Sequence, residues 1–537
     1  MVIRAYPARL AAQSQRGIVA CPHYLASQVG WEILQQGGHA VDAAIATNAA
    51  LGVVYPHMTG LGGDGFWLIY DANHRAIQGL NSSGRAGQAV SRQRFVDQGL
   101  TTLPQRGPEA AMTVPGSLAG WWEAHQRFGR LPWAQLLQPA IDLAETGYPV
   151  TDILQHWIQS NASGLRDHNQ SPLPFLPQDR IPRVGQWLTN LGLAATLRYL
   201  ATAGVAGFYR GAVATSLVTH LQHQGGWLTL RDLAHHQATW VEPIATDYRG
   251  YRVYQMPPNS QGLTLLEMLN MVEPFDLRAL GHGSVDYYHL MVEVTKIAVA
   301  DRDRWLGDPD FTPVPVAALL DKAYGWQRSA QISWTQTQPY LPASLGGDTT
   351  YTAVVDGEGN AVSLIESLYF DFGTQLVLGD LGFPLQNRGA LFSLDPEHPN
   401  CLAPGKRPLH TLMPALVLHP DGGLHLVLGT MGGEGQPQTQ LALLTRVLDF
   451  GFDPYTAIDL PRWLWGRTWG ETAANLCLEG RITATVQEGL RERGHPVQVT
   501  SAWDQRMGHA QMIRINCPGG RLEGSSDRRS DGAALGL

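Results

Sequence analysis

The sequence predicts an α+β fold in which helices and a mostly antiparallel sheet occupy separate layers. Apolar residues at helical spacing are prominent up to about residue 345, and the chain then becomes strand-rich. After that point, three pairs of apolar runs flank short Gly-containing turns, which is the pattern of β-hairpins. Strands and helices in separate blocks are typical of layered α+β packing.

Four helices are expected in the first part of the chain, over 24–34, 41–53, 133–145 and 288–301. Gly37 and Gly38 supply a stop for the first helix, and the Ala-rich second helix suits close packing. The continuous apolar run 66–70 predicts a buried strand directly after a Gly-rich turn, 60–65.

The second part of the chain predicts three hairpins and one helix. The hairpins pair 351–355 with 361–369, 415–418 with 424–428, and 511–515 with 521–523. The helix covers 440–450.

Composition excludes several classes of protein. With 537 residues, 44% of them hydrophobic, the chain is neither disordered nor fibrous. A net charge of −8 gives no electrostatic footprint for nucleic acid or an anionic membrane. No window of about 20 apolar residues occurs, so no membrane span is predicted. The first residues lack the apolar run of a secretory signal, and a cytoplasmic location is expected.

Cofactor and metal motifs are not found. The four Cys are far apart without a CxxC pair, and the 19 His show no HExxH, so neither a metal site nor a cofactor is expected. The Gly-rich segment 60–65 lacks the Gly-Lys-Ser/Thr ending of a phosphate loop and enters a strand, which favours a structural turn. The GxSxG signature of α/β-hydrolases does not occur.

The strongest chemical signal is the segment 346–351. Gly346 and Gly347 form a linker before Asp348, and Thr349 begins a predicted strand. Cleavage of the Asp348–Thr349 bond would give Thr349 a free amine beside its own hydroxyl, and so a base and a nucleophile in one residue. The alternative is that this Thr pair reflects β-propensity alone.

A second segment, 428–435, ends a predicted strand and opens a helix. Gly432 and Gly433 lie at this junction, where two successive backbone N–H groups can point at a developing oxyanion. A Gly-rich turn with no catalytic role is the alternative.

Together these segments resemble the gamma-glutamyltransferase family of N-terminal-nucleophile hydrolases, over nearly the whole chain. The matching stretches are 37–44, 56–64, 114–117, 246–251, 348–350, 356–360 and 431–433. The resemblance implies a four-layer αββα sandwich, made as a proenzyme that cuts itself before Thr349. The expected products are a large chain, 1–348, and a small chain, 349–537, that form one co-folded body and assemble as a heterotetramer.

The resemblance also implies residue roles. Thr349 is the nucleophile for self-cleavage and catalysis, and Ser367 stands where the family has a Thr whose hydroxyl supports the nucleophile. Gly432 and Gly433 match the oxyanion glycines. The implied cycle is attack by Thr349 on a small-molecule amide, release of the amine, and transfer of the acyl group to water or to an amine acceptor.

The implied substrate pocket departs from the family pattern. The Arg expected in an Arg-Glu-x-Ala-Pro stretch is displaced by two positions to Arg85, and the paired serines become His410 and Thr411. The acid that holds the substrate ammonium becomes Leu391, and the Gln before it becomes Arg388. The substrate-binding candidates are Arg85, Tyr369, Arg388, His410 and Thr411, with Tyr369 partly shielding the site.

These departures predict an acyl group with a carboxylate but no ammonium, because a buried ammonium facing Leu391 and Arg388 would lack a partner. Glu366 or Glu434 could supply one, which keeps a gamma-glutamyl substrate as the alternative. The pattern resembles the branch that includes oxamate amidohydrolase and glutaryl-cephalosporin acylases.

Other interpretations stay open at this point. Arg85 and Arg388 can be structural ion-pair partners, and His410 can simply orient a loop. Trp463 and Trp465 are expected to pack in the core. A non-catalytic binding protein that keeps the same fold unprocessed is the alternative function.

Overall fold

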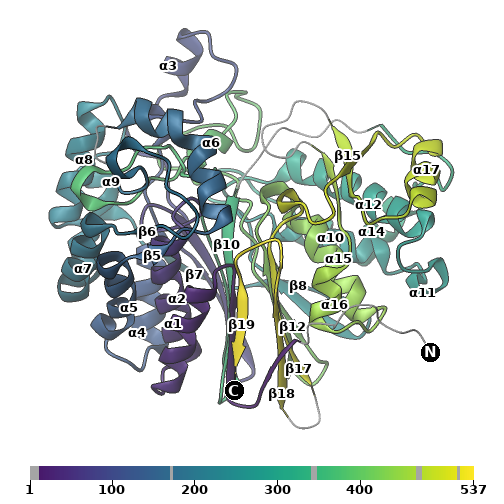
Figure 1. The fold of residues 1–537 in the computed structure, drawn as a ribbon. Helices are drawn as coiled ribbons and strands as arrows, with labels where there is room; N and C mark the ends of the chain where they lie inside the picture. Colours follow the sequence, from purple (N-terminus) through teal and green to yellow (C-terminus); the bar gives the residue numbers. More distant parts are fainter. Residues whose placement is uncertain (1–10, 170–172, 340–347, 467–473, 517–519, 537) are drawn as a thin grey trace.

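The computed structural model describes residues 11–169, 173–339, 348–466, 474–516 and 520–536. Two seven-stranded sheets face each other at the centre, and helices cover the outer face of each (Figure 1). This arrangement confirms the four-layer αββα sandwich.

Both central sheets are antiparallel throughout. The first sheet has the order β19 (Ala533–Gly536), β2 (Gly17–Cys21), β10 (Asp348–Asp356), β11 (Ala361–Tyr369), β3 (Asp64–Asp71), β4 (Ala76–Asn81) and β7 (Thr239–Val241). The second has the order β1 (Ala12–Ser14), β18 (Arg521–Ser526), β17 (Ala510–Asn516), β13 (Leu424–Thr430), β12 (Ala415–Leu418), β9 (Tyr251–Gln255) and β8 (Ile244–Tyr248). Strands from both sides of Asp348 therefore contribute to each sheet.

Two helical layers flank the sheets, as Figure 1 shows. On the side of the first sheet lie α1 (Tyr24–Gln35), α2 (Ala40–Val54), α3 (Arg92–Asp97), α4 (Ser117–Phe128), α5 (Trp133–Thr146), α6 (Asp152–His168), α7 (Leu191–Tyr209), α8 (Ala212–His223) and α9 (Leu230–His235). On the side of the second lie α10 (Gly262–Val272), α11 (Leu277–Leu280), α12 (Val285–Trp305), α13 (Val316–Leu319), α14 (Lys322–Ser329), α15 (Gln436–Leu448), α16 (Pro454–Asp459) and α17 (Ala484–Glu492). Two small sheets join β14 (Trp463–Gly466), β15 (Asn475–Glu479) and β16 (Val497–Thr500), and β5 (Tyr148–Pro149) and β6 (Trp187–Leu188).

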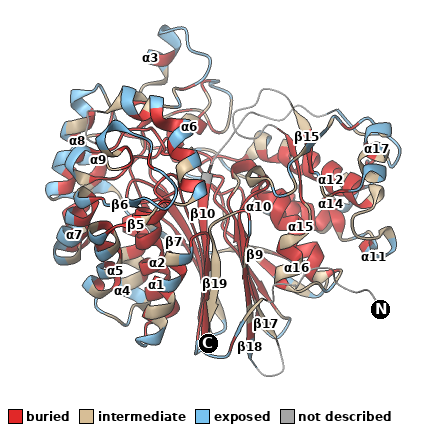
Figure 2. Ribbon diagram, in the orientation of Figure 1, coloured by how far each residue is buried: buried red, intermediate tan, exposed pale blue. Residues whose placement is uncertain are grey.

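The core has three layers because successive side chains of a strand point to opposite faces. In β10, Val354 packs toward the helices, whereas Ala353 and Val355 pack between the two sheets. A third cluster fills the space between the second sheet and α10, α12 and α15. Figure 2 shows the buried residues concentrated in the sheets and on the helix faces that cover them.

The predicted helices and hairpins are confirmed, with boundaries that differ by a few residues. The helix expected over 288–301 is longer and covers Val285–Trp305, and the helix expected over 440–450 begins four residues earlier, at Gln436, because Pro437 fits the first turn of a helix. Trp463 and Trp465 lie in the core, as expected. The linker residues Gly346 and Gly347 fall outside the described residues.

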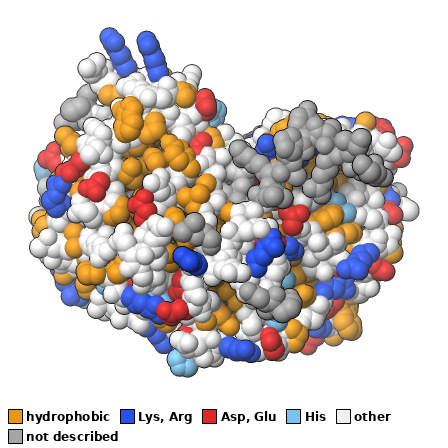
Figure 3. Space-filling model, turned by 60° about the horizontal axis from the view of Figure 1, so that its bottom comes forward, with side chains coloured by type: hydrophobic (Ala, Val, Ile, Leu, Met, Phe, Trp, Pro, Cys, Tyr) orange, Lys and Arg blue, Asp and Glu red, His pale blue; other side chains and the backbone are white. Residues whose placement is uncertain are grey.

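One described helix, α7, is long and apolar enough to cross a membrane by length and composition alone. It lies in the outer helical layer, where it packs against α4, α5 and α8. On the face shown in Figure 3, acidic and basic side chains are interspersed, which fits the net charge of −8.

Candidate active site

The candidate site forms at one end of three neighbouring strands in the centre of the first sheet. Because the strands are antiparallel, β10 begins and β3 begins at the edge where β11 ends. The register places Asp64 of β3 opposite Ser367 of β11, and Asp348 of β10 opposite Tyr369. Residues far apart in the sequence thus meet at this edge.

Thr349, the predicted nucleophile, lies in an irregular part of the ladder. Asp348 pairs with Tyr369 and Thr350 with Glu366, so β11 holds one extra residue opposite Thr349. The Thr349 side chain is buried, and its Oγ1 has no hydrogen-bond partner among the described residues. Bulges of this kind are common next to active sites, where they redirect a side chain.

Ser367 has other partners in the uncut chain. Its Oγ accepts a hydrogen bond of 2.7 Å from the backbone N–H of Tyr369 and one of 3.1 Å from Nη2 of Arg388. The hydrogen bond to Thr349 that the resemblance implies is not formed, because Thr349 Oγ1 is unpartnered. Tyr369 has a φ of +82°, a strained conformation for a residue other than Gly.

Arg388 contacts two of the other predicted substrate-binding residues, Thr411 and Tyr369. It lies fully buried in a short 3₁₀ helix, and its Nη1 donates to Thr411 Oγ1 at 2.9 Å. Its guanidinium lies 4.4 Å from the centre of the Tyr369 ring. Burial lowers the pKa of Arg388 to about 10, which leaves the group charged at neutral pH. Neither of its hydrogen bonds ends at a carboxylate.

His410 pairs with Asp64, an acid that the residue-by-residue assignment did not single out. The Nε2 of His410 lies 3.2 Å from Asp64 Oδ2, and Asp64 Oδ1 accepts from the Gly84 N–H and from Gln386 Nε2. Burial raises the pKa of Asp64 to about 7 and lowers that of His410 well below its usual range. In the sequence, Asp64 could have been found as an acidic residue between glycines at the start of an apolar strand.

The Gly-rich turn 60–65 holds Asp64 in place by close packing. A Cβ on Gly63 would lie 2.6 Å from the carbonyl oxygen of Ser367, and one on Gly62 would lie 2.1 Å from that of Pro384. Only glycine permits these approaches. The turn therefore has a structural role, which is the interpretation that the sequence favoured.

Gly432 and Gly433 follow β13 in the facing sheet. Their φ values of +129° and +52° are ones that side chains disfavour. Neither backbone N–H donates a hydrogen bond to another described residue. Gln261 Nε2 donates to the carbonyl oxygens of both Thr411 and Gly433, at 2.7 and 3.0 Å, and so links the two predicted parts of the site.

Arg85 is held apart from these residues. Its guanidinium pairs with Asp308 at 3.1 Å and Asp310 at 2.5 Å, and donates to the Gly405 carbonyl. No hydrogen bond or ion pair joins it to Arg388 or Thr411 in the described part of the chain. These contacts match its interpretation as a structural ion-pair partner, and its role in substrate binding stays a prediction.

One buried group among the described residues has the spacing of metal ligands: His289, Glu293 and His495. Lys296 Nζ already pairs with Glu293 at 2.8 Å, and the two histidines bond to each other at 2.8 Å. The ammonium group supplies the positive charge that a metal ion would bring, so this cluster is explained as structural.

The αββα sandwich places a hydroxyl residue near the start of a central strand, and the two glycine N–H groups at the end of a strand in the facing sheet donate to no described residue. These features define a self-processing amidohydrolase or acyltransferase of the N-terminal-nucleophile class. The chain belongs to the gamma-glutamyltranspeptidase family, whose model matches residues 26–537.

Individual relatives support the same class. The chain is 45% identical to the glutathione hydrolase-like YwrD proenzyme of Bacillus subtilis, over 97% of this chain and 98% of that one. It is 42% identical to the oxamate amidohydrolase proenzyme of Klebsiella pneumoniae, over 97% and 99%. The structure matches the cephalosporin acylase of Bacillus halodurans with a TM-score of 0.91 and 36% identity, over 100% and 99%. These relatives give no support to the non-catalytic alternative.

Proposed function

We propose that this enzyme cleaves amides of a small acyl group that carries a carboxylate and no ammonium, of the oxamate or glutaryl type. The observation that carries this proposal is the buried Arg388 guanidinium, whose two hydrogen bonds end at the neutral hydroxyls of Ser367 and Thr411. A buried cation without a paired carboxylate is costly, and a substrate carboxylate would supply the missing partner.

Two acidic residues were candidates to hold a substrate ammonium, and neither offers a free carboxylate. Glu434 is paired with the buried Arg302 at 3.0 Å. Glu366 accepts a hydrogen bond from the Trp121 indole, and burial raises its pKa to about 8, so it is mostly protonated at neutral pH. Leu391 takes the position of the family's acid and is itself buried. Glutathione is therefore proposed to be a poor substrate.

The reaction begins with self-cleavage. Thr349 Oγ attacks the Asp348 carbonyl, the peptide nitrogen leaves with a proton, and water hydrolyses the resulting ester to free the Thr349 amine and the Asp348 carboxylate. In catalysis, that amine takes the proton of the Thr349 hydroxyl as it attacks the substrate carbonyl. The N–H groups of Gly432 and Gly433 stabilise the oxyanion, the amine product leaves, and water or an amine acceptor takes the acyl group.

Denaturing electrophoresis tests the processing step. Wild-type protein should yield two fragments, 1–348 and 349–537, and Thr349→Ala should yield one chain. Thr349→Ser keeps a hydroxyl and should still be cut. One intact chain from wild type would contradict the proposed nucleophile and favour a binding protein.

Hydrolysis of glutaryl, oxamate and gamma-glutamyl amides of the same amine tests the substrate class. We expect kcat/KM to be highest for a substrate without the ammonium. Faster turnover of the gamma-glutamyl amide would refute this assignment of Arg388 and Leu391 and leave the proposed nucleophile standing.

We further propose a cytoplasmic location and a heterotetramer of two large and two small chains. Support for the location comes from the free thiols of Cys21 and Cys401, which are typical of a reducing compartment. Cell fractionation tests the location, and the mass of the native particle in solution tests the assembly.

A further inference from the structure

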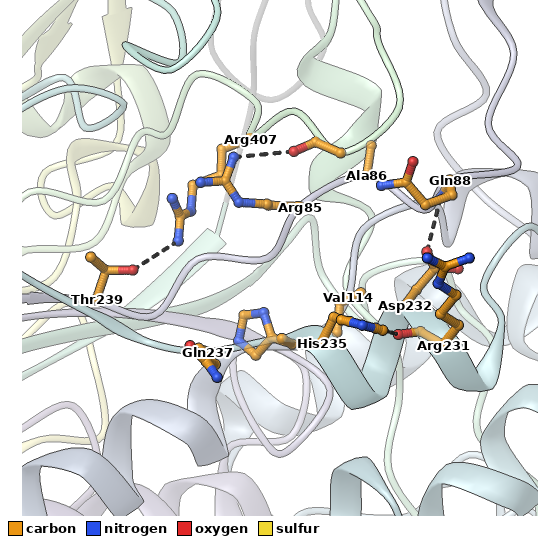
Figure 4. Close-up of a pocket in the computed structure, with 12 residues that line it drawn as sticks. Arg85, Ala86, Gln88, Val114, Arg231, Asp232, His235, Gln237, Thr239 and Arg407 are labelled. Atoms are coloured by element: carbon orange, nitrogen blue, oxygen red, sulfur yellow. Dashed lines mark hydrogen bonds between the residues drawn. The ribbon is translucent and has the colours of Figure 1, made fainter.

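A cavity of about 530 Å³ lies away from Thr349, at the same edge of the first sheet. Figure 4 shows its lining, which includes Arg85, Arg231, Arg407 and His235. His236 also lines the cavity. The cavity lies beside the start of β7, at Thr239, and β7 is four strands from β10 in the sheet. At about 4.8 Å between neighbouring strands, the end of the cavity at Thr239 is roughly 19 Å from β10. Its other end is nearer the candidate active site, because Arg407 donates to the Ser83 carbonyl and the next residue, Gly84, donates to Asp64.

Arg407 is a buried cation whose guanidinium forms no ion pair with a carboxylate in the described part of the chain. Only 8% of the residue is exposed. Its Nε donates to the Ser83 carbonyl at 3.1 Å and its Nη2 to Thr239 Oγ1 at 3.3 Å, both neutral acceptors. Burial, followed by the neighbouring Arg85 guanidinium, lowers its pKa. Asp308 and Asp310 form ion pairs with Arg85, and Asp308 Oδ2 also accepts a hydrogen bond of 2.7 Å from the backbone N–H of Arg407.

The rest of the lining adds a further cation and one acidic side chain whose oxygens already accept hydrogen bonds. Arg231 is exposed on the other side of the cavity (Figure 4), and its guanidinium has no ion pair within the described residues. His236 Nε2 is buried without a hydrogen-bond partner there. The one acid in the lining, Asp232, accepts hydrogen bonds from Gln88 and Thr229, where it caps α9.

We propose that this cavity binds a small dicarboxylate, with one carboxylate at Arg407 and Arg85 and the other at Arg231. Planar guanidinium groups match a carboxylate with two parallel hydrogen bonds. The volume is within the range of small-molecule sites. An anion between Arg85 and Arg407 would relieve the repulsion between their charges, and His236 Nε2 would gain a hydrogen bond.

Titration calorimetry of the full-length protein tests the site, with succinate, acetate and inorganic phosphate as probes. We expect succinate to bind at least tenfold more tightly than acetate or phosphate. Arg231→Ala should remove the advantage of succinate over acetate, because it removes the second cation. Arg407→Gln should weaken both carboxylates at least tenfold, and Arg407→Lys, which keeps the charge, should weaken them less.

Two control variants keep the result specific. Arg183→Ala removes another exposed Arg outside the cavity lining and should bind succinate like wild type. Arg388→Gln removes the carboxylate-binding cation proposed for the active site and should leave in place the succinate binding that depends on Arg231 and Arg407, which separates this cavity from the candidate active site. Absence of succinate binding, binding unchanged in both Arg231→Ala and Arg407→Gln, or binding lost in Arg388→Gln would each overturn the proposal. Phosphate binding as tight as that of succinate would overturn the dicarboxylate assignment.

Discussion

The guanidinium of Arg388 donates a hydrogen bond of 3.1 Å to the hydroxyl of Ser367. The family resemblance implies that this hydroxyl supports the nucleophile Thr349. The same guanidinium reaches Thr411 and lies over the Tyr369 ring. Ser367 therefore links a buried positive charge to the strand edge where Thr349 begins β10. This link places the proposed carboxylate recognition and the nucleophile within one cluster of side chains.

Arg388→Gln should raise KM for a glutaryl or oxamate amide by about 10- to 100-fold, since a hydrogen bond between charged groups contributes roughly 1.5–3 kcal/mol. Arg388→Lys should raise KM less, because it keeps the positive charge but loses the two parallel hydrogen bonds that a guanidinium can donate. Steady-state kinetics measure both. A substrate whose carboxylate is replaced by a carboxamide is the control, and its KM should change little. Equal losses for both substrates would mean that Arg388 acts only on the fold.

Gly432→Ala should lower kcat by about 100-fold with little change in KM, because the turn can no longer aim its N–H groups at the oxyanion. The added Cβ would lie 3.5 Å from Gly508 Cα, an ordinary contact, so the backbone φ of +129° is what it disturbs. Gly451→Ala is the matched control: its φ is +72° and nothing lies within 4 Å. Kinetics on the processed protein decide, and an unchanged kcat in Gly432→Ala would exclude an oxyanion role.

Gly429→Ala should destabilise the protein by about 1–3 kcal/mol through overpacking between the sheets. Its Cβ would lie 2.3 Å from Cε2 of Tyr351, two residues after Thr349 in β10. Tyr351→Leu removes the ring and should restore part of the loss when combined with Gly429→Ala. Denaturant unfolding of the four proteins gives the coupling energy. Strictly additive effects would show that this contact does not set the sheet spacing.

Asp64 and Glu366 should each contribute stability that falls as pH rises from about 4 to about 8. Burial raises their pKa values to about 7 and about 8, from ordinary values of 3.8 and 4.5. In that window the unfolded chain has lost these protons while the folded chain keeps them, so rising pH favours unfolding.

Glu366→Gln removes one of these titrations, so Tm at pH 8 relative to Tm at pH 5 should be higher in the variant than in wild type. Thermal unfolding of wild type and Glu366→Gln at pH 5 and pH 8 measures the difference. Equal changes in Tm for the two proteins would show that Glu366 is already ionised in the folded state.

The sequence by itself determined the elements of this protein and much of its chemistry. Periodicity located the helices and hairpins because the spacing of apolar residues is a local property of the chain. The position of Thr349 at the start of a strand, and of Gly432 and Gly433 between a strand and a helix, could be recognised for the same reason.

Only the tertiary structure decided which charges meet. Arg85 and Arg388 are both Arg residues at positions where the chain departs from the family pattern, yet Arg85 forms ion pairs with Asp308 and Asp310, whereas the hydrogen bonds of Arg388 to described residues end at hydroxyls. Asp64 lies beside His410 because the order of strands in the sheets brings together residues that are hundreds of positions apart in the sequence. Electrostatic partners depend on distance in space and on burial, and neither can be obtained from the spacing of residues along the chain.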